Sequence, residues 1–159
     1  MPLKIRWKAK EYLGIGLLLL GMCGLIQLFF IFIGQYFLGI GSYFVVIIIP
    51  IGITVAIFFA TMIIFESYAQ IERREKLRSQ FRKSQANATI LEKVLNFPIS
   101  KPLLIVFVAF TSLFFITFFI SFIFLDNTLS FIIAENVGAI ACLIIANLVE
   151  KIYGKVQRY

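Results

Sequence analysis

The positive charges of this chain are confined to three segments, and the segments between them are long and apolar. All 15 Lys and Arg residues lie before residue 11, between residues 73 and 101, or after residue 150. Four apolar runs fill most of the remaining chain, at residues 12–33, 43–65, 103–125 and 129–149. Each run has roughly 20 residues or more, which is the length a helix needs to cross about 30 Å of hydrocarbon. The sequence therefore predicts an all-α integral membrane protein with four transmembrane helices.

The placement of the basic residues also predicts how the chain is oriented. Lys and Arg accumulate in the cytoplasmic segments that flank membrane spans. We therefore expect the two tails and the central segment 66–101 in the cytoplasm, with residues 34–42 and 126–128 as short turns outside. The predicted architecture is two helical hairpins in a single membrane domain, residues 1–159. Its expected location is a plasma membrane or a bacterial inner membrane, with both the N and C termini cytoplasmic.

The composition argues against a soluble catalytic domain. Of the 159 residues, 61% are hydrophobic and 14% are charged, and the mean hydropathy is +0.99. The net charge of +7 is explained by orientation and by attraction to anionic headgroups on the cytoplasmic side, so no nucleic-acid partner is expected. The sequence has no His, no phosphate-binding loop motif and no nucleophile-elbow motif. We therefore expect no enzymatic activity, no cofactor and no metal site.

One acidic residue lies well inside an apolar run. Glu135 is about six residues, or roughly 9 Å, from the outer end of the fourth span. An ionised carboxylate is costly at this depth, so we expect Glu135 to face the bundle interior or a wet cavity, to be protonated, or to have partners. Five other residues lie at about the same level and complete a predicted intramembrane polar layer: Gln27, Pro50, Thr117, Ser121 and Asn136.

This polar layer supports two interpretations. In the first, Glu135 is a hydrogen-bonding hub that fixes the register of the helices. In the second, it is an ion or proton site or a contact for the charge of another protein, because ionisable residues inside a membrane commonly have a function. No Lys, Arg or His lies within the apolar runs to pair with it. The sequence leaves both interpretations open.

Small residues predict where the helices pack most closely. A face of small side chains spaced four residues apart lets two helix backbones approach each other. The residues expected at such contacts are Ala134, Gly138, Cys142 and Ala146 in the fourth span, and Gly21 and Gly24 in the first. We therefore expect the fourth helix at the centre of the bundle. The phenylalanines of the third span surround much of its circumference, which predicts a peripheral helix in contact with acyl chains or with the apolar surface of a partner.

The central cytoplasmic segment is expected to continue the second helix beyond the membrane. It contains no Gly, and no Pro before Pro98, and Glu72 and Lys76 form a helix-supporting pair four residues apart. An apolar stripe on this helix either folds back onto the membrane surface or docks a partner subunit. The basic residues expected to contact headgroups or a partner are Arg73, Arg74, Lys76, Arg78, Arg82 and Lys83.

These features favour a non-enzymatic accessory or partner-recognising subunit of a membrane complex. A first alternative is a small homo-oligomeric channel or transporter that uses Glu135 as its ion or proton site. A further alternative is an inner-membrane immunity protein that neutralises a pore-forming toxin. The chain is similar to these classes in size and topology only, so the likeness supplies no site residues. The expected partners are membrane lipid and either another membrane protein or further copies of this chain.

Overall fold

The regular elements of the protein are helices throughout the described residues. A computed structural model describes residues 10–79 and 99–154, with side chains for 13–69 and 99–152. The elements are α1 (Lys10–Phe32), the π-helical turn η1 (Ile33–Phe37), α2 (Tyr43–Ser79), α4 (Ser100–Phe122) and α5 (Asn127–Gly154). Within them, the stretches apolar enough to cross a membrane are Leu13–Phe37, Tyr43–Ala69, Ser100–Phe122 and Asn127–Ile152. This confirms the prediction of an all-helical chain with four helices of membrane-spanning length.

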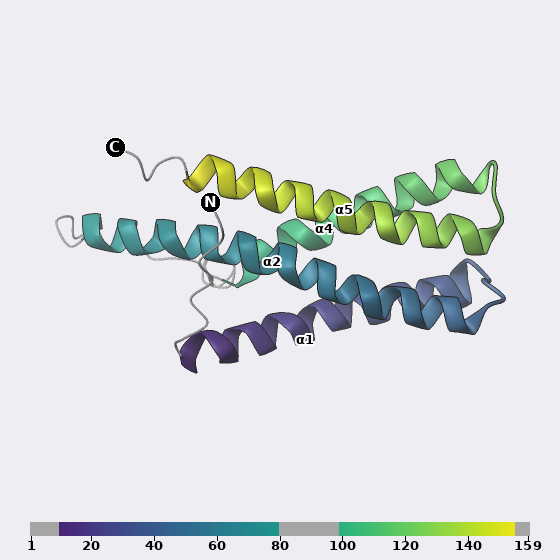
Figure 1. Cartoon of the computed structure of the whole chain (residues 1–159), viewed down its shortest axis with the longest axis horizontal. Coiled ribbons are helices and arrows are strands. Elements are labelled where there is room, and N and C mark those ends of the chain that lie inside the picture. Colours follow the sequence, from purple (N-terminus) through teal and green to yellow (C-terminus); the bar gives the residue numbers. More distant parts are fainter. Residues whose placement is uncertain (1–9, 80–98, 155–159) are drawn as a thin grey trace, which may run out of the picture.

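Two short connections lie at the same end of the bundle, called here the turn end (Figure 1). The first joins α1 to α2, where η1 prolongs α1 and Gly39 adopts a φ of +62° as the chain reverses. A left-handed backbone of this kind is most easily adopted by glycine. The second connection joins α4 to α5. The amide Nδ2 of Asn127 donates a hydrogen bond of 3.0 Å to the carbonyl of Leu38, so the start of α5 is tied to the first connection.

The interior of the bundle is shared by α2 and α5. α2 packs against α1, α4 and α5, while α5 packs mainly against α2 and α4. Of the four spans, α5 is the most buried and α4 is the least buried. The fourth helix therefore shares with α2 the central position that was expected for it alone.

A cluster of phenylalanine rings fills the bundle between three helices. Phe110, Phe114 and Phe118 follow one another at four-residue steps along α4, and all three are buried. The Phe114 ring meets Phe30 of α1 edge to face at 4.7 Å between centroids, and it meets Phe131 of α5 at 5.8 Å. The expectation that the phenylalanines of the third span contact lipid or a partner is wrong for this buried row. The exposed phenylalanines at this helix and its end are Phe107, Phe119, Phe122 and Phe124.

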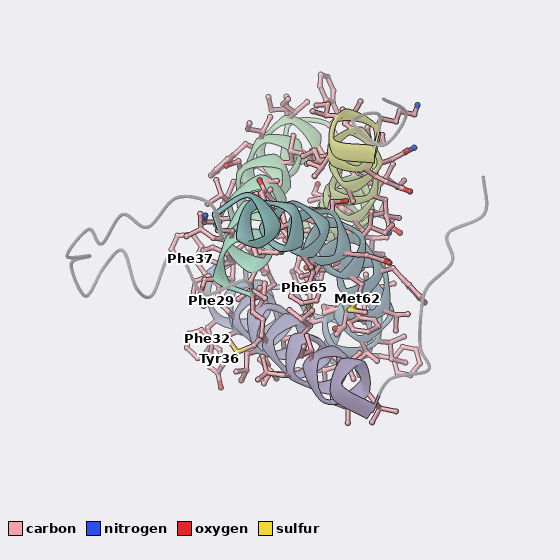
Figure 2. The ribbon with its side chains drawn as sticks, turned by 90° about the vertical axis from the view of Figure 1, so that its left-hand side faces the viewer. Phe29, Phe32, Tyr36, Phe37, Met62 and Phe65 are labelled. Atoms are coloured by element: carbon pink, nitrogen blue, oxygen red, sulfur yellow. The ribbon has the colours of Figure 1, made fainter. Side chains whose placement is uncertain are left out.

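The outward-facing side chains of all four spans are largely apolar. Large exposed hydrophobic residues occur along α1, α2, α4 and α5, and a surface of this extent is stable in a bilayer but not in water. Figure 2 shows Phe29, Phe32, Tyr36 and Phe37 on the outside of the bundle. Tyr36 and Phe37 are 71% and 78% exposed at the turn end. Aromatic residues are enriched in such positions at membrane–water interfaces.

Candidate functional site

The structure brings together two members of the predicted polar layer and separates the others. Glu135 is 0% exposed and Gln27 is 2% exposed, and Pro50 is also buried. Asn136, by contrast, is exposed, and its Nδ2 donates to the carbonyl of Ile132 on its own helix at 2.8 Å. The layer is therefore centred on Gln27 of α1 and Glu135 of α5.

The hydroxyl groups expected near Glu135 do not bond to it. Thr117 and Ser121 are half-buried on α4, and neither oxygen of the Glu135 carboxyl has a hydrogen-bond partner. Thr54 and Thr61 of α2 are also occupied, because each donates at 2.8 Å to the carbonyl four residues earlier in its own helix. Threonines inside helices commonly satisfy themselves in this way. Neither threonine therefore donates to Glu135.

Gln27 is the polar side chain that interacts with Glu135. Its amide lies close enough to interact with the Glu135 carboxyl, yet neither side chain makes a hydrogen bond of ordinary length and angle. Within the described part of the chain, four polar atoms of these two side chains are thus buried without a hydrogen bond of ordinary geometry, namely Oε1 and Nε2 of Gln27 and both carboxyl oxygens of Glu135. Each buried group left in this state costs about 1–3 kcal/mol. A pair that carries such a cost calls for an explanation beyond packing.

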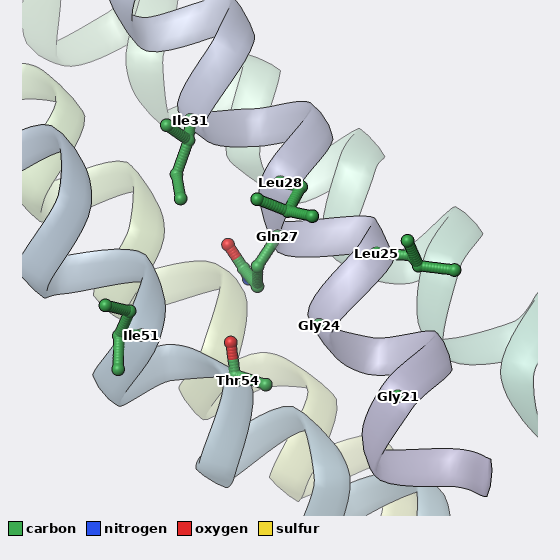
Figure 3. Close-up of a pocket in the computed structure, with 8 residues that line it drawn as sticks. All are labelled: Gly21, Gly24, Leu25, Gln27, Leu28, Ile31, Ile51 and Thr54. Atoms are coloured by element: carbon green, nitrogen blue, oxygen red, sulfur yellow. The ribbon is translucent and has the colours of Figure 1, made fainter.

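A groove between α1 and α2 reaches the Gln27 side chain of this pair from the lipid-facing side. Its volume is about 340 Å³, and its lining residues are Gly21, Gly24, Leu25, Gln27, Leu28, Ile31, Ile51 and Thr54. Figure 3 shows the Gln27 side chain extending from α1 into the groove, with the Thr54 hydroxyl directed toward it from α2. The other lining residues carry no polar side chain. Gln27 therefore lines an open apolar groove and also interacts with the fully buried Glu135 carboxyl group.

The two glycines of the groove have room beside them. No neighbouring side chain or helix lies within 4 Å of the position that a Cβ atom would take at Gly21 or Gly24. The rim is formed by side chains that are mostly exposed, including Leu25 at 59% and Leu28 at 58%. Among the described residues, the predicted close-contact residues of the first span thus have open space at their Cβ positions and no neighbouring helix there.

The predicted packing residues of the fourth span lie inside the bundle. Ala134, Cys142 and Ala146 are almost completely buried. Gly138 lies against α4, where an added Cβ would approach a ring carbon of Phe110 to 2.9 Å. Small residues at this face allow α4 and α5 to pack closely.

The structure describes only some of the predicted cytoplasmic docking residues. Arg73, Arg74, Lys76 and Arg78 lie on the backbone of α2, which continues to Ser79 after its apolar part ends at Ala69. Their side chains lie outside the described residues. Arg82 and Lys83 lie outside the described chain altogether.

Sequence reasoning missed two residues beside the site. Thr54 lines the groove, and Phe131 is buried one turn from Glu135. The four-residue spacing of Phe131 and Glu135 was a usable signal, because residues four apart share a helix face. Thr54 gave no such signal, since its depth alone does not show which way it points.

Comparison with protein families, curated proteins and solved structures gives no match to this chain. Within the described residues, no group of three or more His, Cys, Asp or Glu side chains is arranged to hold a metal ion. The two cysteines, Cys23 and Cys142, are buried free thiols. The site must therefore be interpreted from its own geometry, which is an apolar groove with a buried amide at its base and a carboxyl group behind it.

Proposed function

We propose that this protein is a non-enzymatic accessory or partner-recognising subunit that binds a transmembrane helix of another membrane protein. The observation that carries this proposal is the groove between α1 and α2. It combines the free surface at Gly21 and Gly24 with a buried Gln27 amide that has no hydrogen-bond partner. Small residues permit close backbone approach between membrane helices, and polar side chains form hydrogen bonds across such contacts. The groove offers both.

The cytoplasmic continuation of α2 is a second contact in this proposal. The helical backbone runs ten residues past Ala69, as far as Ser79, and the sequence of this extension includes Arg73, Arg74 and Arg78. Basic residues at this position attract anionic headgroups of the inner leaflet. They would hold the extension near the membrane surface or against the cytoplasmic part of the same partner.

The proposed orientation places both termini in the cytoplasm and the turn end outside. A cysteine at the exposed position Gly41 is then expected to react with an impermeant thiol reagent added outside the cell, and one at Ser79 is expected not to react. The native thiols Cys23 and Cys142 are buried, so they contribute little background. Labelling of Ser79→Cys but not of Gly41→Cys would reverse the proposed topology.

Site-specific photo-crosslinking tests the partner-binding function. A photoreactive residue at Leu28, on the rim of the groove, is compared with one at Ile116 on α4. These positions are 58% and 55% exposed, so they have matched access to surrounding lipid. We expect Leu28 to give one dominant adduct with a different membrane protein and Ile116 to give none. Identical adduct patterns at the two positions, or adducts only between copies of this chain, would refute the proposal.

An ion or proton site at Glu135 is the second candidate function, because both carboxyl oxygens are buried and unpartnered. The aromatic cluster counts against conduction through a single chain. Phe131 lies one turn from Glu135 toward the turn end and packs against Phe114, and all three side chains are fully buried. Conduction would therefore need several copies around an axis. It predicts cation flux in reconstituted vesicles that the Glu135→Gln substitution alters.

A further inference from the structure

We infer that the helix bound in this groove carries a basic side chain, Arg or Lys, at the level of Gln27, and that this cation pairs with the Glu135 carboxylate. The inference rests on the proposed function, since it assumes that a helix of another protein occupies the groove. It adds the chemistry by which that helix is recognised.

The geometry makes Gln27 the entrance to Glu135. Glu135 itself is 0% exposed and is absent from the lining of the groove, whereas Gln27 both lines the groove and interacts with the carboxyl group. Figure 3 shows the Gln27 amide at the centre of the groove, between α1 and α2. A polar group that enters from the lipid side therefore meets Gln27, the lining residue that also interacts with the carboxyl group.

The charge that would complement Glu135 is missing from this chain. The sequence contains no His, and its apolar runs contain no Lys or Arg. Lys151 is the nearest basic residue along α5, and 16 residues of helix place it about 24 Å away along the axis. A second copy of the chain has the same distribution of charge and cannot supply the cation at this depth. The complementary residue must therefore belong to a different protein.

The unpartnered atoms of the layer match a guanidinium group especially well. Arg has five N–H donors in a planar fork. Two of them can serve the two Glu135 oxygens while a third serves Oε1 of Gln27, so three of the four unpartnered atoms would gain hydrogen bonds. A lone charge inside a membrane is costly for either protein, and pairing offsets part of that cost for both. Helices without a basic residue at this level would leave the layer unsatisfied, so they should bind more weakly.

The test uses the full-length protein in proteoliposomes and three labelled transmembrane peptides, with binding measured by energy transfer. The peptides share one Leu- and Ala-based sequence and differ only in the central residue, which is Arg, Gln or Leu. We expect the Arg peptide to bind about tenfold more tightly than the Leu peptide, the scale of one interhelical polar contact, with the Gln peptide between them. The Glu135→Gln variant should bind the Arg peptide no better than the Leu peptide.

A third protein, the Gly24→Leu variant, separates failure of this inference from failure of the proposed function. Binding that Gly24→Leu weakens for all three peptides, with no preference for Arg, would overturn the inference and leave the proposed function standing. An Arg preference that persists in Glu135→Gln would overturn the inference as well. The absence of Gly24-dependent binding by any peptide would overturn the proposed function itself. Retained binding of the Leu peptide by Glu135→Gln shows that this isosteric variant is folded.

Discussion

The glycine of the interface between α4 and α5 and the glycines of the groove between α1 and α2 differ in what lies beside them. Where α4 and α5 meet, a Cβ added to Gly138 would come within 2.9 Å of Phe110. In the groove between α1 and α2, a Cβ added to Gly24 or Gly21 would have nothing within 4 Å. Glycine is needed at position 138 because the Phe110 ring leaves no space for a side chain there. Among the described residues, nothing covers the Cβ positions of Gly21 and Gly24.

The two regions also differ in the chemistry of the side chains that they bury. Around Phe114 the packed surfaces are aromatic, with ring contacts to Phe30, Phe110, Phe118 and Phe131. Beside the groove, the amide and carboxyl groups are buried without hydrogen bonds. A stable monomer gains nothing from the second arrangement, which costs about 1–3 kcal/mol for each unsatisfied group. The first region is closely packed, whereas the second buries unsatisfied polar groups beside an open groove.

Truncation of the aromatic cluster should have the largest effect on folding. We expect Phe114→Ala to lower the free energy of unfolding in mixed micelles by about 3–5 kcal/mol, because it leaves a cavity among the aromatic rings that contact Phe114. Circular dichroism during denaturant titration measures this change. The control is Ile116→Ala, which removes a side chain that is 55% exposed and should have little effect. Equal losses in the two variants would show that the cluster is not the core of the fold.

Filling the two glycine positions tests the comparison directly. We expect Gly138→Ala to lower the free energy of unfolding by about 1–3 kcal/mol, since the new methyl group overpacks the buried Phe110 ring. Gly24→Ala should leave the free energy of unfolding unchanged, because nothing lies within 4 Å of the new methyl group. The same titration is used for both variants. If Gly24→Ala were the more damaging of the two, the groove would be part of the folded core.

Removing the polar pair distinguishes its two interpretations. We expect the double substitution Gln27→Met and Glu135→Met to leave the free energy of unfolding unchanged or to raise it by about 1 kcal/mol. The reason is that apolar groups of similar shape relieve the unsatisfied burial. The same variant should lose partner binding at the groove. A clear loss of stability would instead support the interpretation of Glu135 as a hub that fixes helix register.

Much of the fold could be predicted from charge segregation and the lengths of the apolar runs. The ends of the helices are harder to predict from the sequence. The apolar run of the first span predicts an end at Ile33, whereas the helix continues through the π-helical turn to Phe37. The phenylalanines of the third span surround the helix, so the sequence could not show that Phe110, Phe114 and Phe118 alone turn inward. That selection depends on where α1 and α5 happen to pack.

The sequence predicts the level of the site residues along their helices, but it does not predict the helix face on which each residue lies. Counting residues from the turns predicts Gln27 and Glu135 at one level, and both side chains are buried. The same count included Asn136, which follows Glu135 in sequence and is therefore rotated by about 100° around α5 to the exposed surface. The groove itself could not be predicted, because it depends on how far α1 separates from α2 and not on any residue pattern.

The central claim is that the groove between α1 and α2 is a binding surface for another membrane protein. The most direct test is native mass spectrometry of the particle extracted gently from its own membrane, for the wild-type chain and for Gly24→Leu. The account predicts that the wild-type 18.2 kDa chain is found with a different, reproducible second protein. It also predicts that Gly24→Leu, with an unchanged unfolding transition, is found alone. A wild-type particle that contains only copies of this chain, or one that Gly24→Leu leaves unaltered, would contradict it.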